Sequence, residues 1–203
     1  MPGAFPHKII FIRHGETAFN ANGRLQGQRD IPLNARGREQ ASAVGRYLRD
    51  AYGGEIARID ASGAFWASPL GRTRETIELA RAAMGLAPPA YRIDARLKEL
   101  SFGEWEGMSW REVERIDAAG VKARKADKWR FAPPGGESYA MLARRVKSWL
   151  DERDSDSFLA AHGGVGRVLM ALLAGVAEET AESADIWQGR AAIFDQGGFN
   201  WVG

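Results

Sequence analysis

The stretch Lys8-Ile9-Ile10-Phe11-Ile12-Arg13-His14-Gly15 decides how the rest of this sequence is interpreted. After its first residue it runs through four apolar side chains, mostly β-branched, a pattern that predicts a buried β-strand. An arginine, a histidine and a glycine follow immediately, and glycine lets the backbone approach a ligand closely. The stretch therefore predicts a strand that carries polar groups to a site at its carboxyl end.

A second histidine has a matching context near the end of the chain. The run Phe158-Leu159-Ala160-Ala161 predicts another buried strand, and His162 follows it directly, before Gly163 and Gly164. In layered α/β sheets, ligands bind beyond the carboxyl ends of the strands. Either histidine alone could as readily be structural as functional, but two in matched positions favour one shared functional site.

Short apolar runs alternate with helical patterns along the rest of the chain. Further strands are predicted at residues 64–67 and 91–94, with a closing pair at 191–195 and 199–202. Helices are predicted at residues 34–52, 68–84, 138–152 and 165–176. This alternation indicates an α/β fold, a three-layer αβα sandwich with a mostly parallel sheet.

Local signals predict where two of these helices begin and which face of a third is buried. Asn34 suits a helix N-cap, and Ser68 with Pro69 suits a cap followed by the first helical position. In the helix at residues 138–152, helical spacing turns five apolar side chains inward: Met141, Leu142, Val146, Trp149 and Leu150.

Residues 104–136 interrupt the alternation. They contain Trp105, Trp110 and Trp129 and end in Pro133-Pro134-Gly135-Gly136, which predicts a small helical, lid-like insertion within one domain spanning residues 1–203. Between residues 111 and 130, seven basic residues accompany four acidic ones. This excess favours a segment that overhangs a pocket and attracts anionic substrates, although a solvated helix face would have the same composition.

Composition excludes several classes of function. With 28 basic and 26 acidic residues, the net charge of +2 is too balanced for a general nucleic-acid or membrane-surface binder. The absence of cysteine excludes disulfides and thiolate chemistry, and three histidines are too few for a histidine-rich metal cage. The longest apolar run, residues 168–177, is too short to cross a bilayer, and the first six residues show no signal peptide, so we expect a cytoplasmic protein.

The histidines and two of the arginines suit phosphoryl chemistry. A neutral imidazole can be a nucleophile when one nitrogen is free and the other donates a hydrogen bond. A phosphoryl group needs planar, permanently charged forks, which arginine supplies. Arg13 adjoins the first histidine, and Arg72 falls on the first turn of a predicted helix, where an anion is favoured. Arg72 could equally be a solvated charge near Glu75 and Glu78.

Six ordered segments, spread over most of the chain, carry a more specific pattern. They are Arg13-His14-Gly15-Glu16-Thr17 with Asn20; Gln26-Gly27 with residues 30–33, Gly37 and residues 40–41; residues 68–73; residues 97–99 with 102–107; residues 134–138; and residues 162–165. Together they resemble the signature of the histidine phosphatase superfamily, the phosphoglycerate mutase-like proteins.

The resemblance implies the fold of that family and a role for each matching residue. His14 would be the nucleophile that becomes phosphohistidine, and Glu99 the general acid for the leaving oxygen, in preference to Glu104 and Glu106. The groups that would surround the phosphoryl oxygens and the substrate are Arg13, Arg72, His162, Asn20, Thr17, Gln26, Gly27 and Gly163. No metal ion or cofactor is implied, the partner would be a small phosphorylated metabolite, and a homodimer is compatible with the pattern.

Two reactions compete within that family. The mutase pattern has arginine after the acid glutamate, tyrosine before the following glycine, and Thr-Gly-Trp after the nucleophile, where this chain has Leu100, Phe102 and Gln26-Gly27-Gln28. After His162 and Gly163 the chain has Gly164-Val165, where mutases usually have a polar pair. These departures resemble the phosphatase branch, including its broad-specificity and alpha-ribazole phosphatases, so we predict a phosphomonoester hydrolase. A cofactor-dependent phosphoglycerate mutase is the alternative, and a non-catalytic phospho-ligand binding module is disfavoured because every catalytic residue type is present.

Overall fold

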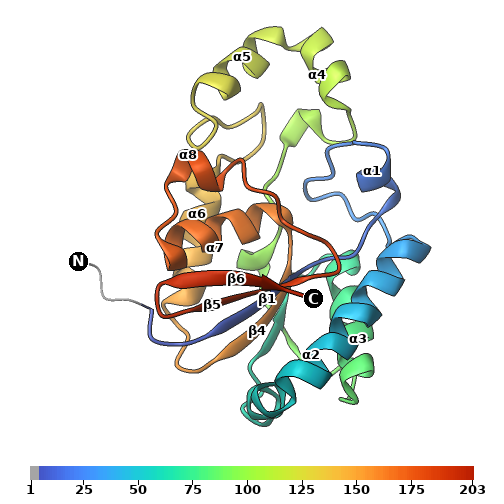
Figure 1. The fold of residues 1–203 in the computed structure, drawn as a ribbon. Helices are drawn as coiled ribbons and strands as arrows, with labels where there is room; N and C mark the ends of the chain where they lie inside the picture. Colours follow the sequence, from blue (N-terminus) through green and yellow to red (C-terminus); the bar gives the residue numbers. More distant parts are fainter. Residues whose placement is uncertain (1–4) are drawn as a thin grey trace.

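Six β-strands form one mixed sheet at the centre of the structure, a computed structural model that describes residues 5–203 (Figure 1). Their order across the sheet is β3-β2-β4-β1-β5-β6. The strands are β1 (Ile9–Arg13), β2 (Phe65–Ala67), β3 (Arg92–Ile93), β4 (Ser157–Ala161), β5 (Ala191–Asp195) and β6 (Gly198–Val202). The first four in spatial order are parallel to one another, β5 is antiparallel to its neighbour β1, and β6 is antiparallel to β5. The signal-peptide prediction falls largely on residues 1–4, which lie outside the described residues.

Helices connect the strands and cover the sheet. They are α1 (Ala18–Ala21), α2 (Ala35–Ala61), α3 (Gly71–Met84), α4 (Trp110–Ile116), α5 (Ala118–Ala126), α6 (Tyr139–Leu150), α7 (Gly163–Ala174) and α8 (Glu178–Ala181), with short 3₁₀ turns at Ala95–Leu97 and Gly103–Trp105. None of the helices formed by residues 5–203 is both long enough and apolar enough to cross a membrane.

Alternate side chains of β1 build two separate cores, one on each face of the sheet. Ile9 and Phe11 belong to the cluster that contains the buried faces of α6 and α7. Ile10 and Ile12 belong to the cluster that contains those of α2 and α3. Because successive side chains of a strand point to opposite faces, one wholly apolar strand requires helices on both sides. The predicted three-layer αβα sandwich is confirmed (Figure 1).

The register of the central strands brings the two histidines together. Strands β1 and β4 are parallel neighbours, and Arg13 lies opposite Ala161, the last residue of β4. The backbone N–H of His14 then donates to the carbonyl oxygen of Ala161, at 2.9 Å. His14 and His162 therefore leave the sheet side by side at its carboxyl edge.

Two helix ends differ from the prediction by more than two residues. The helix predicted to end at Tyr52 continues as α2 to Ala61, with non-helical backbone angles at Tyr52 itself (φ −132°, ψ 21°). The pattern is broken there, but the chain resumes a helix that buries Ile56 and Ile59. The next helix begins at Gly71, with Leu70 as its N-cap, and Ser68 does not cap it. The hydroxyl of Ser68 is instead hydrogen-bonded to the ring of His162. This tertiary contact uses the side chain that the sequence suggested as a helix cap.

One predicted core residue is wrong. Met141 in α6 is 44% exposed, whereas the other four predicted inward residues of that helix are buried. Met141 shares a helix face with Arg144 and Ser148, which are also exposed, so it lies outside the buried stripe of α6.

The predicted insertion lies beyond the carboxyl edge of the sheet. Helices α4 and α5 lie at the top of the view, and the lower ends of α2 and α3 lie at the opposite end of the molecule (Figure 1). They enclose a small apolar cluster of their own, built from Leu25, Trp105, Val113 and Val121. That residues 104–136 act as a lid on a single domain stays a prediction.

Candidate active site

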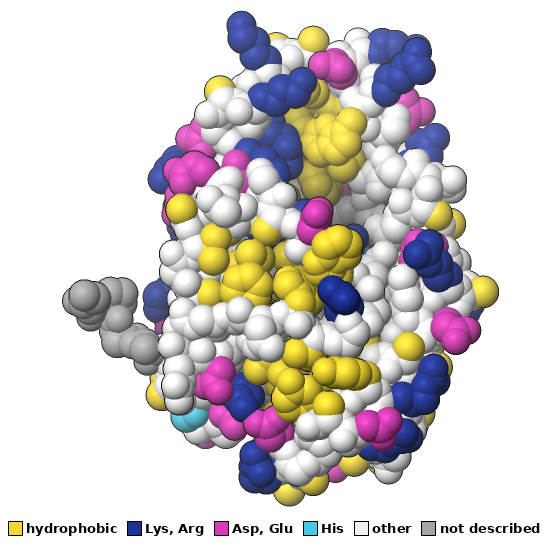
Figure 2. Space-filling view, viewed as in Figure 1, with side chains coloured by type: hydrophobic (Ala, Val, Ile, Leu, Met, Phe, Trp, Pro, Cys, Tyr) yellow, Lys and Arg dark blue, Asp and Glu magenta, His cyan; other side chains and the backbone are white. Residues whose placement is uncertain are grey.

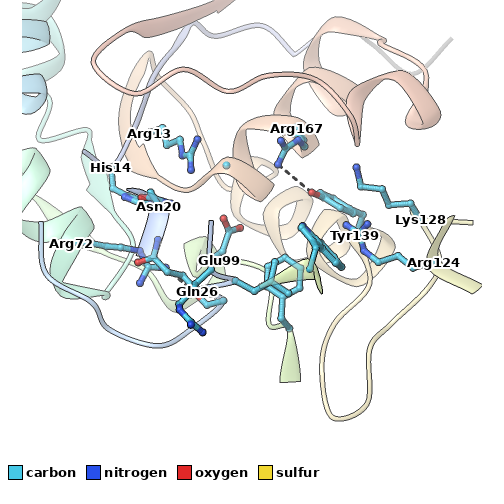
Figure 3. Close-up of a pocket in the computed structure, with 16 residues that line it drawn as sticks. Arg13, His14, Asn20, Gln26, Arg72, Glu99, Arg124, Lys128, Tyr139 and Arg167 are labelled. Carbon is cyan, nitrogen blue, oxygen red and sulfur yellow. Dashed lines mark hydrogen bonds between the residues drawn. The ribbon is translucent and has the colours of Figure 1, made fainter. Parts of the chain in front are cut away.

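A cavity of about 390 Å³ opens at the carboxyl edge of the sheet (Figure 3). Eight of the ten residues predicted from the sequence line it: Arg13, His14, Asn20, Gln26, Gly27, Arg72, Glu99 and Gly163. They come from segments far apart in the chain, at the ends of β1 and β4, the start of α3 and two loops. Thr17 and His162 do not line it.

The ring of His14 is held in the form that leaves one nitrogen free. Its Nδ1 lies 2.8 Å from the carbonyl oxygen of Gly15. A carbonyl oxygen only accepts, so Nδ1 carries the proton and donates, and Nε2 keeps its lone pair. An added Cβ at Gly15 would overlap the backbone of Gly37. The glycine after the histidine is therefore required by close packing against the start of α2.

Both site histidines are neutral before a ligand arrives. Burial lowers the pKa of His14 well below its usual range, and the charges of Arg72 and Arg13 lower it further. The pKa of His162 is lowered well below its usual range by burial first and then by Arg72 and His14. A neutral imidazole is the nucleophilic form, so these positive neighbours favour the reactive state of His14.

His162 lies against His14 and is completely buried. The two ring centroids are 5.3 Å apart and the rings meet edge to face. Its Nε2 lies 2.8 Å from the hydroxyl oxygen of Ser68, and its Nδ1 is buried with no partner among the described residues. A buried polar atom without a hydrogen-bond partner costs free energy, so this nitrogen is suited to a hydrogen bond with a bound ligand.

Two guanidinium groups flank the histidines without any carboxylate partner in residues 5–203. Arg72 is fully buried, and it donates to the carbonyl oxygens of Arg29 (2.6 Å) and Gly27 (2.8 Å). Arg13 donates to the carbonyl oxygen of Ile186, at 2.9 Å. The Nε atoms of both arginines are buried and unpartnered. Buried cations held by neutral carbonyls, with donors to spare, suit an anion that comes from solution.

The carboxylate of Glu99 is held at the N-terminal end of α7. The N–H of Gly164 donates to both of its oxygens (3.0 and 3.1 Å), and the N–H of Leu100 donates to one of them (2.8 Å). An added Cβ at Gly164 would overlap the same carboxylate, so glycine is needed there. These contacts hold Glu99 in the lining of the same pocket as His14 (Figure 3).

The two other candidates for the general acid, Glu104 and Glu106, do not line the pocket. Glu106 accepts the backbone N–H groups of Gln28 (2.9 Å) and Phe102 (3.1 Å), and it holds these loops together from outside the pocket. Glu104 is exposed and does not line the cavity.

Thr17 lies outside the pocket and is hydrogen-bonded to Asn20, which lines it. It is fully buried as the N-cap of α1, and its hydroxyl and backbone bond the side chain of Asn20. Thr17 does not line the pocket, because capping α1 turns its hydroxyl toward Asn20, and its contact with substrate stays a prediction. Asn20 does line the pocket, and Gln188 donates to its side-chain oxygen at 3.0 Å.

Four lining residues were not singled out in the sequence: Arg24, Leu25, Tyr139 and Arg167. Arg167 lies on α7 one turn after Gly163, and Tyr139 is the first residue of α6. One Nη of Arg167 donates to the Tyr139 hydroxyl at 3.3 Å. The spacing of four residues from Gly163 would have predicted that Arg167 shares a helix face with it. Of the insertion's tryptophans, Trp110 lines the pocket, and Trp105 is buried in the cluster beside it.

No group of three or more histidine, aspartate or glutamate side chains in residues 5–203 is arranged to hold a metal ion.

A three-layer α/β sandwich with a mostly parallel sheet and this edge site defines a phosphoglycerate mutase-like fold, and comparison with known proteins agrees. The sequence pattern of the histidine phosphatase superfamily (branch 1) matches residues 9–201. The chain is 34% identical over 183 residues to glucosyl-3-phosphoglycerate phosphatase of Mycolicibacterium vanbaalenii, covering 83% of this chain and 75% of that one. It is 33% identical over 179 residues to the "Probable phosphoglycerate mutase GpmB" of Erwinia tasmaniensis, covering 83% and 75%.

The solved structures agree in fold. Alpha-ribazole phosphatase from Shigella flexneri superposes with a TM-score of 0.78 and 27% identity, over 96% of this chain and 94% of that one. The chain belongs to the histidine phosphatase superfamily, and the resemblance predicted from the sequence is confirmed.

Proposed function

We propose that this chain hydrolyses small phosphomonoesters through a phosphohistidine formed on Nε2 of His14. The chain is a phosphoric monoester hydrolase, in keeping with the phosphatases among its relatives. The observation that carries the residue assignment is the bond from His14 Nδ1 to the Gly15 carbonyl, which leaves Nε2 as a lone-pair nucleophile beside two unpaired guanidinium groups.

In the first step, Nε2 attacks phosphorus in line with the leaving alcohol. The N–P bond forms as the P–O bond breaks, and Glu99 donates a proton to the departing oxygen. Arg13 and Arg72 neutralise the charge that spreads over the phosphoryl oxygens. In the second step, the Glu99 carboxylate accepts a proton from water, whose oxygen attacks phosphorus and releases phosphate from His14.

His162 supports this transfer through its unpartnered nitrogen. When the Ser68 hydroxyl donates to Nε2, the proton of the ring lies on Nδ1, which then donates to a phosphoryl oxygen. The phosphate dianion of a bound substrate also offsets the charges of Arg13 and Arg72. Because those charges lower the pKa of both histidines, the bound dianion raises it again. His162 would therefore bind the anion more strongly as charge develops.

The trapping experiment uses a ³²P-labelled phosphate donor and rapid denaturation. The wild type should carry acid-labile phosphate and His14→Ala none. A wild type that stays unlabelled while it releases phosphate would contradict the covalent route. Phosphate release in the presence of a chelator tests the proposed independence from metal ions.

Hydrolysis is proposed over mutase activity because of the departures at Gln26, Leu100 and Phe102. The test incubates the enzyme with 3-phosphoglycerate and a trace of 2,3-bisphosphoglycerate. Release of inorganic phosphate supports the hydrolase, and fast isomerisation without release would establish the mutase that one relative's name suggests.

The proposal also includes a cytoplasmic location, a homodimer, and no nucleic-acid or membrane partner. The balanced charge of the chain supports the last two points. Light scattering on the purified protein measures the mass in solution and so tests the homodimer.

A further inference from the structure

One ion pair outside the pocket holds the backbone on both sides of Glu99. Its members are Arg145 of α6 and Glu137, which lies just before that helix. Neither side chain lines the cavity, which opens in the hollow below α4 and α5 (Figure 2). Only 19% of the Arg145 side chain and 21% of the Glu137 side chain are exposed. The pair is therefore largely buried, but it is not placed to touch a ligand in the pocket.

All five N–H groups of the Arg145 guanidinium have an acceptor. One Nη donates to the carbonyl oxygens of Arg96 and Lys98, both at 2.6 Å. The other Nη donates to the carbonyl oxygen of Glu99 (3.0 Å) and to a carboxylate oxygen of Glu137 (2.9 Å). Nε donates to the second oxygen of Glu137, at 3.1 Å. Three of the five donors are thus spent on the backbone that leads to Glu99.

Glu137 holds the chain after Glu99. Its carboxylate accepts the N–H of Ser101 at 3.1 Å, and its own N–H donates to the carbonyl oxygen of Ser101 at 2.9 Å. The side chain of Gln28 adds a bond to the Glu99 carbonyl oxygen, at 3.2 Å. We call residues 96–101 the acid segment. One ion pair binds this segment at both of its ends.

The other contacts of the acid segment leave its orientation to this pair. Leu97 and Leu100 are buried in the core, but apolar contacts have no preferred direction. Within residues 5–203 the Glu99 carboxylate accepts hydrogen bonds only from the backbone N–H groups of Leu100 and Gly164. These bonds form only if the backbone of Glu99 is already in place. The directional bonds of Arg145 and Glu137 meet that requirement.

We propose that Arg145 and Glu137 are positioning residues for the reaction, which fix the acid segment so that the Glu99 carboxylate meets the leaving oxygen. The inference rests on the proposed function, because it takes Glu99 as the general acid. Arginine is needed at position 145 because a lysine ammonium has three donors and no planar fork, so it cannot hold three carbonyl oxygens and both oxygens of a carboxylate.

The test compares two substrates that differ in their need for an acid. An alkyl phosphate has a leaving oxygen that must be protonated, whereas p-nitrophenyl phosphate has a leaving group that departs without a proton. The measured quantity is kcat/KM for the alkyl phosphate divided by kcat/KM for p-nitrophenyl phosphate. This ratio reports the step in which the alcohol leaves, and it cancels a loss of activity common to both substrates.

Arg145→Lys keeps the charge and removes the fork. It should lower the ratio about tenfold or more, because a displacement of a catalytic group by about 1 Å costs up to about 100-fold in rate. Arg144→Lys, at the exposed neighbouring position of α6, is the matched control and should keep the wild-type ratio. A ratio in Arg145→Lys equal to that of Arg144→Lys would overturn the inference.

Glu137→Gln tests the same pair from its other side and serves if Arg145→Lys does not fold. An amide has one oxygen where the carboxylate has two, so at least one of the N–H groups from Arg145 or Ser101 would face another donor. The ratio should fall about threefold or more, as the loss of a hydrogen bond to a charged group does. An unchanged ratio in folded Glu137→Gln would overturn the inference.

A double-substitution cycle shows whether Arg145 acts through Glu99. In a Glu99→Gln background, Arg145→Lys should change kcat/KM for the alkyl phosphate by less than about twofold, because residues that act as one unit do not give independent losses. Losses that multiply in full would overturn the inference and leave the proposed function standing. A Glu99→Gln enzyme that keeps the wild-type ratio would instead overturn the assignment of Glu99 in the proposed function.

Discussion

The tautomer of His14 depends on one backbone oxygen, and that oxygen depends on a glycine. Gly15 fits against Gly37 only because neither residue has a side chain, and this contact holds the carbonyl that accepts from Nδ1. The sequence predicted the residue types at this site, since adjacent residues such as Arg13 and His14 are fixed by the strand before them. It could not predict that His162 is buried behind the pocket, because that follows from packing between distant segments.

Arg72 should be sensitive even to a substitution that keeps its charge. Its fork spans two carbonyl oxygens while Nε remains for a ligand, and a lysine ammonium cannot do both. We expect Arg72→Lys to lower kcat about 100-fold, as the loss of a preorganised anion donor does. Steady-state kinetics check this, with Arg74→Lys, an exposed neighbour on α3, as the control. An Arg72→Lys enzyme as active as that control would show that the fork geometry is unimportant.

Gly164→Ala should displace the general acid without removing it. The new Cβ would overlap the Glu99 carboxylate. We expect kcat to fall about 100-fold for an alkyl phosphate, whose leaving oxygen needs a proton, and far less for p-nitrophenyl phosphate, whose leaving group does not. Gly53→Ala, where a Cβ meets nothing within 4 Å, serves as the control. Equal losses on the two substrates would contradict the assignment of Glu99.

At the scale of elements, the contact between α2 and α3 depends on Gly45. A Cβ there would overlap the carbonyl oxygen of Ala80. We expect Gly45→Ala to lower the free energy of unfolding by about 1–3 kcal/mol, the usual cost of overpacking. Gly54→Ala, in the same helix but with only the Arg58 side chain at van der Waals distance from the new Cβ, should raise it by about 0.5–1 kcal/mol. Urea unfolding measures both, and a Gly45→Ala protein as stable as Gly54→Ala would show that the helices separate without cost.

Element ends were harder to predict than element types. The pattern of apolar residues located every strand of the sheet, because strand periodicity is a local property. Ser68 and Tyr52 mark the two helix ends that differed by more than two residues, and both were decided by tertiary contacts that local signals do not contain. Ser68 bonds His162, and the helix after Tyr52 is held by the burial of Ile56 and Ile59.

At the scale of the whole molecule, the layered fold followed from alternation, and the site followed from strand register. A sequence places His14 and His162 at two strand ends, but only the pairing of β1 with β4 makes them neighbours. The cations opposite them show the limit of the approach. The sequence shows the basic excess of residues 111–130, and the fold decides that Arg124 and Lys128 enter the pocket while Lys122 and Lys125 do not.

The stability of the molecule should fall below about pH 6.5, the ordinary histidine pKa. His14 and His162 have native pKa values well below that range, so between pH 6.5 and pH 5 the unfolded chain binds protons that the native protein excludes. Each such histidine lowers the free energy of unfolding by up to about 1.4 kcal/mol per pH unit on acidification. Stability therefore rises with pH across this window, and the contribution is complete above it.

Replacing one of the two histidines isolates this contribution from that of the carboxylates. His162→Gln should lose less stability than the wild type between pH 6 and pH 5, by up to about 1.4 kcal/mol. Between pH 7 and pH 8 the two proteins should give parallel curves, because both histidines are then neutral in the native and the unfolded state. Urea unfolding across both windows provides the measurement. Parallel curves in the acidic window as well would mean that His162 is protonated inside the native protein, and its buried Nδ1 would then need an acceptor other than a bound phosphoryl group.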